Sequence, residues 1–275
     1  MKTNIKIIFG CLLAVSLATV AYGCKGKASN SDNGADTVAT AKPVGPTFNA
    51  DSAYAFTAAQ CDFGPRVMNS ATHDKCGKWI VEKFKEYGCD VQEQKADLKA
   101  YDGTVLKATN IIPRFNPEAK KRILICAHWD SRPWADNDPD STNHKKPVMA
   151  ANDGASGVAV MLELARQLQA DKKLKVGVDF VCFDAEDWGV PRWETRYPNA
   201  DDSWALGAQY YAKNFPTAVK PEFGILLDMV GGEGAQFYRE GMSVQFASDV
   251  VNRVWEAAKG AGFGSYFPDA VGGMV

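Results

Sequence analysis

Three short, continuously apolar segments place the strongest constraint on how this chain can fold. They cover residues 122–128, 176–183 and 223–227, and each has the length and composition of a strand that is buried on both faces. Helical patterns lie between them, over 155–170 and 203–215. Strands that alternate with helices predict an α/β fold, with a mostly parallel or mixed central β-sheet covered by helices on both faces.

Capping residues and periodicity predict the remaining elements. Ser70 can cap a helix whose apolar side chains recur at three-and-four spacing, and Gly88 is a suitable stop for it. Asp51 can cap a shorter helix that ends at Ala59. We also expect strands over 89–95 and 104–113, and a last helix that opens at Ser243 or Ser248 and ends near Gly260.

Acidic and histidine side chains stand at the carboxyl end of each buried strand. The strands end at His128-Trp-Asp130, at Asp184-Ala-Glu-Asp187 and at Asp228, and Asn152-Asp153-Gly-Ala-Ser-Gly157 opens a helix. One such carboxylate alone is usually a helix cap or a solvated loop residue. Because the carboxyl ends of parallel strands meet at one edge, these clusters should lie together. Crowded carboxylates repel unless a cation balances them, and Asp, Glu and His without Cys suit zinc.

The same four segments resemble the motifs of a known enzyme family. In order and spacing, His128-Trp-Asp130-Ser131, Asn152 to Gly157, Asp184 to Asp187 and Leu227-Asp228-Met229 are similar to the zinc aminopeptidases and their relatives, the animal-type glutaminyl cyclases. Phe63-Gly64-Pro65-Arg66 and the helix around Trp79 resemble that family too. The resemblance extends from about residue 50 to the last residue. It implies the α/β fold of that family and a zinc site.

The resemblance also implies a role for each site residue. Asp153 and Asp187 should be zinc ligands, and Glu186 should be the general acid and base. Asp228 should bind a second zinc in an aminopeptidase, or lie as a buried acid beside the reacting groups in a cyclase. His128 should be a ligand of that second zinc in an aminopeptidase, and an unligated neighbour in a cyclase. A cyclase would therefore hold one zinc ion, and an aminopeptidase two.

Two features favour a glutaminyl cyclase, which converts the N-terminal glutamine of peptides or proteins to pyroglutamate and releases ammonia. The loop after the acid pair is rich in tryptophan, and aromatic walls suit a small amide near a metal, so Trp188 and Trp193 are the expected substrate-binding residues. Asp130-Ser-Arg-Pro-Trp134 resembles the bacterial members of the same group. The simpler alternative is that these tryptophans only pack the loop. An exported two-zinc aminopeptidase also stays open, because the metal positions of that enzyme that lie within the chain are filled.

The third ligand of a single zinc site is the part of the pattern that this sequence lacks. In the family it is a histidine near the C-terminus, whereas the chain has only His73, His128 and His144. His144 lies in a polar, lysine-rich loop and is expected to be solvated. We therefore expect the chain to be a piece of a longer protein, with the third histidine beyond Val275. The alternatives are a natural truncation and a non-catalytic envelope lipoprotein that retains the fold.

The first residues have the form of an export signal. An apolar run over 7–20 follows a lysine-containing start, and Ala21-Tyr-Gly-Cys24 resembles a bacterial lipobox. We expect a signal peptide over 1–23, a lipidated Cys24 with a flexible tether over 24–47, and a catalytic domain over 48–275. These features predict a lipoprotein of a Gram-negative envelope, periplasmic or at the outer membrane, that touches the membrane only through its lipid. Plain secretion is the alternative.

The charge and the cysteine content of the chain argue against nucleic-acid binding and against a zinc site made of cysteines. The formal net charge of -2 gives no electrostatic reason to bind nucleic acid. No cysteine pair in the domain has C-x-x-C spacing, which argues against a cysteine zinc site. Cys126 and Cys182 lie in apolar strands and are expected in the core, whereas the sequence leaves open one disulfide among Cys61, Cys76 and Cys89.

Overall fold

The computed structural model describes residues 45–170, 174–197 and 201–273. The predicted signal peptide, the lipidated Cys24 and nearly all of the tether lie outside these residues. Residues 45–49 are exposed and form neither helix nor strand, and the first helix begins at Ala50. None of the helices in the described ranges is long and apolar enough to span a membrane.

The described residues form one five-stranded mixed sheet. Its order is β1-β2-β4-β3-β5, with β1 at Asp90–Lys99, β2 at Val105–Phe115, β4 at Gly177–Phe183, β3 at Arg122–His128 and β5 at Gly224–Leu226. β3 pairs in parallel with both β4 and β5, whereas β2 is antiparallel to both β1 and β4. The predicted fold class is confirmed as a mixed sheet, in which the three apolar segments form the parallel part.

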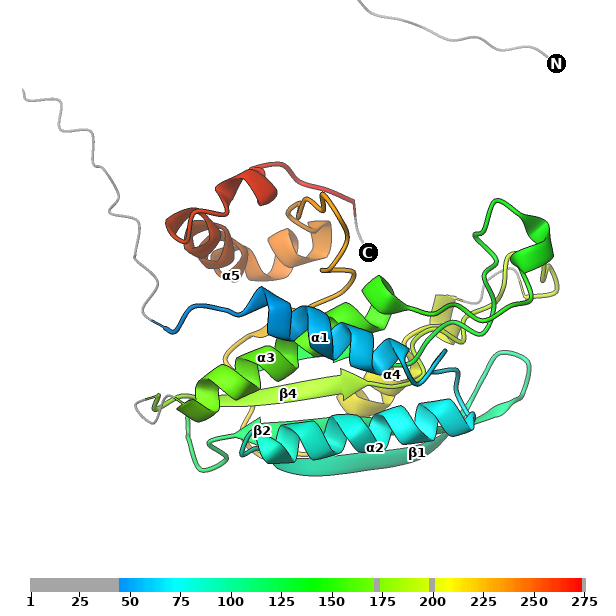
Figure 1. Ribbon diagram of the computed structural model, residues 1–275, viewed down its shortest axis with the longest axis horizontal. Coiled ribbons are helices and arrows are strands. Elements are labelled where there is room, and N and C mark those ends of the chain that lie inside the picture. Colours follow the sequence, from blue (N-terminus) through cyan, green and yellow to red (C-terminus); the bar gives the residue numbers. More distant parts are fainter. Residues whose placement is uncertain (1–44, 171–173, 198–200, 274–275) are drawn as a thin grey trace, which may run out of the picture. The chain divides into compact units, whose positions relative to one another are not determined.

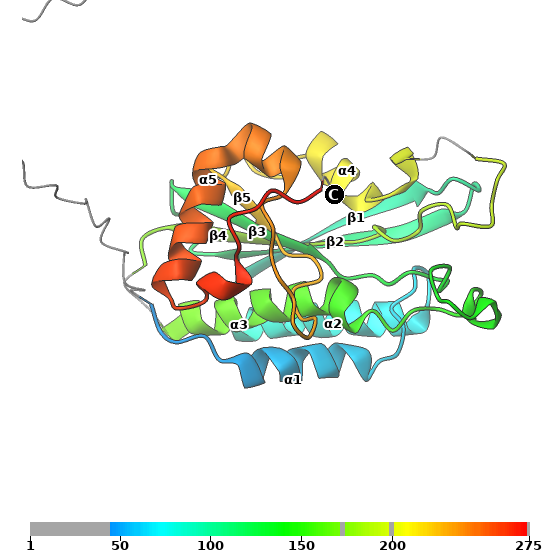
Figure 2. The same ribbon diagram turned by 90° about the horizontal axis from the view of Figure 1, so that it is seen from above.

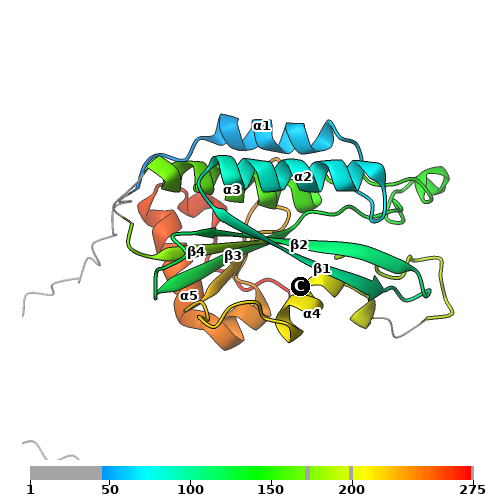
Figure 3. The same ribbon diagram turned by 90° about the horizontal axis from the view of Figure 1, so that it is seen from below.

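Helices cover both faces of this sheet, as Figure 3 shows. α2 (Ala71–Glu86) and α3 (Ser156–Ala170) lie on one face, and α1 (Ala50–Cys61) packs outside them against α3. α4 (Leu206–Lys213) and α5 (Gly241–Gly260) lie on the other face, a separation that Figure 2 also shows. Short helical turns occupy Ser141–Asn143, Ala151–Ala155, Asp201–Ser203 and Gly264–Tyr266.

Apolar side chains fill the space between the sheet and each helical layer. On one face Ile80 and Phe84 of α2 share a fully buried cluster with Leu162 of α3 and Phe180 of β4. Burying a side chain of this size stabilises the fold by roughly 1.5–3 kcal/mol. A smaller cluster on the opposite face includes Tyr211 of α4. β3 and β4 are therefore covered on both faces, as their apolar composition predicts. The same prediction is wrong for β5, where Leu226 is 59% exposed, because no further element of the described residues packs over this edge strand.

The ends of the first two helices follow local capping chemistry. Ser70 caps α2 as predicted, because its side chain accepts a main-chain N–H of the first turn at 3.1 Å. Gly88 follows the end of α2 with a left-handed φ of 76°. The predicted cap of α1 is wrong: Asn49 accepts the N–H of Ser52 at 3.0 Å, and Asp51 lies inside the first turn.

The start of α5 differs from both predicted positions. The helix begins at Gly241, where the side chain of Glu240 accepts two main-chain N–H groups of the first turn. Ser243 therefore lies inside the helix. The φ of Ala247 is −146°, which interrupts the helical geometry immediately before Ser248. The serine at 248 thus marks a kink in one helix and not a beginning.

All five cysteines of the described residues are free thiols. Cys126 and Cys182 are buried, which confirms their predicted place in the core. The disulfide that the sequence left open among the other three is not formed. Burial raises the pKa of Cys76 and of Cys89 to about 12, so these two thiols stay protonated.

The carboxyl ends of the parallel strands determine where the site lies. In Figure 1 the arrow of β4 points toward the end of the molecule from which the long loops after β3 and β4 extend. Figure 2 shows the same two loops at that end from above. This edge of the sheet carries the acidic and histidine residues that the sequence singled out.

Candidate metal centre

Three of the candidate residues converge at this edge of the sheet. His128 is the last residue of β3, Asp153 lies in the turn before α3, and Asp187 follows β4. One ligand atom from each lies within 4.8 Å of the other two. Glu186 and Asp228 border the group, because one oxygen of each lies 3.7 Å from a ring nitrogen of His128. The structure thus brings five residues from four segments to one place.

The imidazole of His128 makes most of the contacts within the group. Its side chain is only 1% exposed, and Nε2 lies 2.8 Å from Oδ1 of Asp153. On the other side of the ring, Nδ1 lies 3.7 Å from Oδ1 of Asp130. The histidine therefore faces carboxylates on both sides.

Asp130 orients the acid pair through the main chain. It is wholly buried, and its two oxygens accept the N–H of Glu186 at 3.0 Å and the N–H of Asp187 at 3.1 Å. These bonds join the end of β3 to the loop after β4. Ala185 precedes the pair with a φ of 52°, a left-handed conformation that costs a non-glycine residue about 1 kcal/mol. The bonds from Asp130 help to hold this strained loop.

The turn that presents Asp153 depends on the absence of a side chain at Gly154. The φ of Gly154 is 97°, and an added Cβ would lie 3.0 Å from the main-chain oxygen of Asp130 and 3.0 Å from Cε1 of His128. A larger residue would therefore push the turn away from the histidine. The turn Ala151–Ala155 has π-helical hydrogen bonding interrupted by non-helical angles at Asp153, an irregularity that is frequent at functional sites.

The same turn holds the loop that carries Asp228. Oδ1 of Asn152 accepts the N–H of Gly231 at 2.8 Å, and Oγ of Ser156 accepts the N–H of Val230 at 3.1 Å. Gly157 allows this close packing, because a Cβ there would lie 2.4 Å from the main-chain oxygen of Leu227. The small and polar residues of this motif therefore set the position of Asp228.

Burial and mutual repulsion perturb the acids of the group. Burial, reinforced by the neighbouring carboxylates, raises the pKa of Glu186 to about 7. Burial followed by the charge of Asp130 raises the pKa of Asp187 to about 8. Burial alone would lower the pKa of His128, but the surrounding carboxylates outweigh it and raise that pKa well above its ordinary value. Without a cation these neighbouring acids resist ionising together, and a bound divalent cation would stabilise their ionised forms.

The donor atoms fit such a cation. Among the described residues, buried atoms without a hydrogen-bond partner include Nδ1 of His128, Oδ2 of Asp187 and Oδ1 of Asp228. Buried polar atoms without partners are costly, and a cation bound at Asp187 would satisfy the unpaired oxygen of that residue. Imidazole nitrogen and carboxylate oxygen without thiolate is a donor set that zinc accepts. The group contains His128, for which the sequence predicts a ligand role only in the two-zinc alternative.

Tryptophan rings stand beside the acid pair. Trp188 directly follows Asp187, and its ring meets that of Trp134 edge to face, with centroids 5.5 Å apart. Trp134 also meets Trp193, with centroids 6.1 Å apart. Trp134 therefore joins the two tryptophans for which the sequence predicts substrate binding. Its position in the Asp130-Ser-Arg-Pro-Trp134 motif was the signal that could have placed it in the site.

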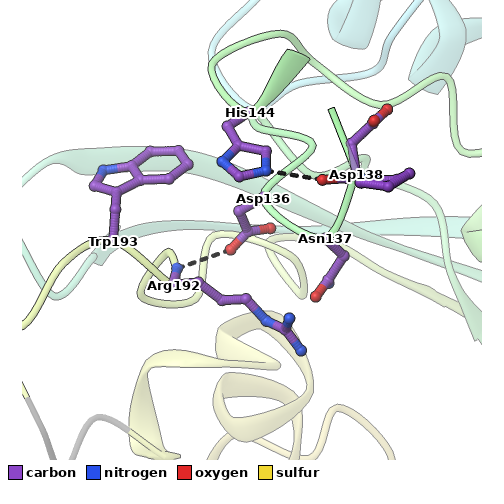
Figure 4. A pocket seen from close by; sticks show the side chains of 7 residues that line it. Asp136, Asn137, Asp138, His144, Arg192 and Trp193 are labelled. Carbon is purple, nitrogen blue, oxygen red and sulfur yellow. Dashed lines mark hydrogen bonds between the residues drawn. The ribbon is translucent and has the colours of Figure 1, made fainter. Parts of the chain in front are cut away.

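A pocket of about 440 Å³ opens beside Trp193, as Figure 4 shows. Asp136, Asp138 and Arg192 also line it. The ring of His144 stacks on Trp193 with an angle of 13° between the planes, and its Nε2 donates to the main-chain oxygen of Asp138 at 2.8 Å. His144, which the sequence leads us to expect in solvent, is half-buried and lines this pocket.

Arg132 connects this pocket to the metal centre. Its guanidinium donates to both carboxylate oxygens of Asp136 at 2.6 Å and to the main-chain oxygen of Asp187 at 3.0 Å. It also lies 4.5 Å from the ring centroid of Trp204, a cation–π contact. One buried side chain thus ties the pocket wall to the loop of the acid pair.

A second histidine lies beneath the site. Nε2 of His73 lies 2.8 Å from Oδ1 of Asp184, both residues are buried, and the His73 ring stacks on Trp129 at 4.1 Å. The other oxygen of Asp184 accepts the N–H of Thr109 at 2.7 Å. The pair supports the main chain just before Glu186. The sequence placed His73 in the early helix without a role, although its spacing from the apolar residues of that helix indicates a buried position.

Comparison with known proteins identifies relatives of this fold and site. Residues 110–272, which include every residue of the metal centre, match peptidase family M28. The glutaminyl-peptide cyclotransferase of Drosophila melanogaster is 26% identical over 181 residues, which are 63% of this chain and 47% of that protein. The chain therefore spans about half the length of this relative.

Two solved structures from Bacteroides thetaiotaomicron are more similar. One is a glutaminyl cyclase bound to N-acetylhistamine, 48% identical with a TM-score of 0.82, over 84% of this chain and 79% of that chain. The other is a leucine aminopeptidase precursor, 49% identical with a TM-score of 0.81, over the same shares of the two chains. Because the family match covers more than half of its residues, this chain belongs to peptidase family M28.

Proposed function

We propose that this protein is a zinc-dependent glutaminyl-peptide cyclotransferase, which closes the N-terminal glutamine of peptides or proteins to pyroglutamate and releases ammonia. The observation that carries the proposal is the series of ring contacts that runs from Trp188, which directly follows Asp187, through Trp134 to Trp193. Such a series of aromatic rings suits a small uncharged amide that is held near a cation and shielded from water. The similarity to the fly cyclotransferase and to the bacterial cyclase supports the same reaction.

We propose that Asp153 and Asp187 hold one zinc ion together with a third protein ligand. A catalytic zinc site has three protein ligands and an open position for the substrate. When bound, zinc supplies Lewis-acid polarisation of the carboxamide of the glutamine side chain. His128 then stays an unligated neighbour and keeps its hydrogen bond to Asp153, at the 2.8 Å that the structure has.

Glu186 is the proposed general acid and base. Its side chain is 30% exposed at the edge of the group, so a substrate can reach it, and a pKa of about 7 suits proton transfer in both directions. Glu186 takes a proton from the α-amine while the amine nitrogen bonds to the amide carbon of the side chain. It returns a proton to the amide nitrogen while the old carbon–nitrogen bond breaks and ammonia leaves.

Asp228 is proposed to hold the path of that proton. Its side chain is 30% exposed, and Oδ1 lies 3.7 Å from Nε2 of His128. The interaction with His128 lowers the pKa of Asp228, so this carboxylate stays ionised near neutral pH. An ionised acid here can accept a hydrogen bond from the substrate amine and direct its proton toward Glu186.

An aminopeptidase with two zinc ions is the second candidate. The observation that favours it is the position of His128, which lies 2.8 Å from Asp153 and 3.7 Å from Asp228, so ligands for a second ion stand together. The similarity to the leucine aminopeptidase precursor points the same way. In that reaction Glu186 would take its proton from water, and the first peptide bond would break.

Two peptides distinguish these candidates. The protein made from its complete reading frame is incubated with a glutamine-initiated and a leucine-initiated peptide, with and without a chelator. The products are identified by mass spectrometry. We expect the glutamine peptide alone to lose the mass of one ammonia, and the chelator to stop the reaction. Release of free leucine would instead establish the aminopeptidase.

We also propose, from the N-terminal sequence, that the enzyme is exported and attached to the envelope by a lipid on Cys24. The tether over 24–47 would let the domain reach peptides away from the membrane. A Cys24→Ser variant should move from the membrane fraction to the soluble fraction of the producing bacterium. A variant that stays with the membrane would show that another feature holds it there.

A further inference from the structure

Arg66 is a fully buried arginine whose side chain bonds to main-chain oxygens. It belongs to the Phe63-Gly64-Pro65-Arg66 segment after α1, and none of its surface is exposed. Its guanidinium donates to three main-chain oxygens: those of Trp129 at 3.1 Å, Met149 at 2.9 Å and Ala150 at 2.7 Å. Burying a charge is costly. Because the buried guanidinium of Arg66 bonds to main-chain oxygens, its role is to hold those main-chain segments in position.

These oxygens belong to the two segments that carry the metal-centre residues. Trp129 lies between His128 and Asp130, and its segment is bound a second time, because Ser131 donates its N–H to the main-chain oxygen of Arg66 at 3.1 Å. Met149 and Ala150 lead into the turn that presents Asp153. One side chain thus spans the gap between the segment of the histidine and the segment of the aspartate.

The bond to Ala150 also stabilises a strained conformation. Ala150 has φ 56° and ψ 46°, in the left-handed region that a residue with a Cβ enters at a cost of about 1 kcal/mol. Its oxygen accepts the shortest of the three bonds from Arg66 and also the N–H of Ala155 at 3.3 Å. The turn of Asp153 is therefore held at its beginning by the guanidinium.

We infer that Arg66 is a positioning residue of the metal centre, whose guanidinium clamps the segments of His128 and Asp153 at the separation that metal binding requires. The inference rests on the metal centre of the proposed function. A planar guanidinium can direct three nitrogens to three separate oxygens, whereas a lysine ammonium is one point charge. A lysine at position 66 keeps the positive charge but cannot reach all three oxygens. Arg66→Lys therefore separates the effect of the hydrogen bonds on metal binding from the effect of the charge.

Arg122 provides a matched control. It is also fully buried and donates to main-chain oxygens, among them that of Asn116 at 2.7 Å, but it also pairs with Asp179. It lies at the start of β3, the opposite end of that strand from His128. Arg122→Lys should therefore disturb a buried arginine of the same kind without reaching the metal centre.

The experiment measures zinc affinity by competition with a chromophoric chelator, and the absorption spectrum of the cobalt(II) form, for the folded full-length proteins. We expect Arg66→Lys to weaken zinc binding roughly 10- to 100-fold and to change the cobalt spectrum, as loss of an outer partner of a metal site does. Arg122→Lys should lower the unfolding temperature but keep the wild-type zinc affinity and spectrum. Equal zinc affinity in Arg66→Lys and wild type, or an equal loss in Arg122→Lys, would overturn the inference.

If Arg66→Lys does not fold, a second pair of variants tests the same inference. Ala150→Gly removes the left-handed strain, so the double variant Arg66→Lys/Ala150→Gly is compared with Ala150→Gly alone. We expect the double variant to bind zinc several-fold more weakly, and equal affinities would contradict the clamp. A wild-type protein that binds no zinc at all would refute the proposed metal centre and the inference together, whatever the peptide assay shows.

Discussion

Replacing Glu186 with glutamine should lower the rate of pyroglutamate formation by roughly 10²- to 10⁴-fold, the usual contribution of a general acid and base. Glutamine has the shape of glutamate but cannot carry the proton between the two nitrogens. The fold should not suffer, because Asp130 binds the main-chain N–H of residue 186 and not its side chain. Turnover of a glutamine-initiated peptide, zinc affinity and unfolding temperature are the quantities to measure.

Glu194→Gln is the matched control for this variant. Glu194 belongs to the same loop and pairs with the exposed Arg196, away from the group around His128. Its replacement should leave the rate within about two-fold, since a surface ion pair contributes little to stability. A near-normal rate for Glu186→Gln would remove Glu186 from the mechanism. A low rate in both variants would indicate a general effect of the loop.

Replacing Asp153 with asparagine should remove most of the zinc affinity and the activity with it. Asp153 is one of the three residues that offer ligand atoms within 4.8 Å of one another, and asparagine is a much poorer zinc ligand than a carboxylate. We expect a loss of more than about 100-fold in zinc affinity, beyond that of an outer partner. Its side chain is 46% exposed, so the fold should tolerate the change.

Unfolding temperature with and without zinc separates loss of metal from loss of fold. A ligand present at about 100 times its dissociation constant stabilises a protein by about 2.7 kcal/mol. Zinc should therefore raise the unfolding temperature of the wild type and of Asp97→Asn, whose exposed carboxylate binds Lys107 on the far strands β1 and β2. Zinc should leave the unfolding temperature of Asp153→Asn unchanged. An equal rise in all three proteins would exclude Asp153 from the metal site.

The arrangement of the site follows from a rule that the sequence displays directly. The segments 122–128, 176–183 and 223–227 are mostly apolar, and each ends in a histidine or is followed closely by acids. Parallel strands have their carboxyl ends on one edge, so the meeting of His128 with Asp187 needs no information beyond the pattern. The observed parallel pairing of β3 with β4 and β5 supplies that arrangement.

Contacts between loops could not be predicted in the same way. The stacking of His144 on Trp193 joins residues far apart in sequence, in two loops that follow different strands. Neither loop has a period that fixes which side chain faces the other. Only the observed path of both loops shows that the polar segment around His144 forms a pocket wall.

The sequence also does not predict which polar side chains are buried. Arg66 and His73 are charged or polar residues that composition alone places at the surface, yet both are buried. Their partners are main-chain oxygens in one case and Asp184 in the other, from distant segments. A pattern of apolar residues carries no signal for such bonds. The sequence of Phe63-Gly64-Pro65-Arg66 resembles the family, but the main-chain partners of Arg66 are known only from the structure.

One peptide substrate distinguishes cyclisation from cleavage at the metal centre. A peptide that begins Gln-Leu is incubated with the zinc-loaded full-length protein, and the product is identified by mass and by reaction of its amino terminus. We expect a full-length peptide that has lost one ammonia and has a blocked terminus. Free glutamine and a peptide that begins with leucine would contradict the cyclase and assign the metal centre to an aminopeptidase.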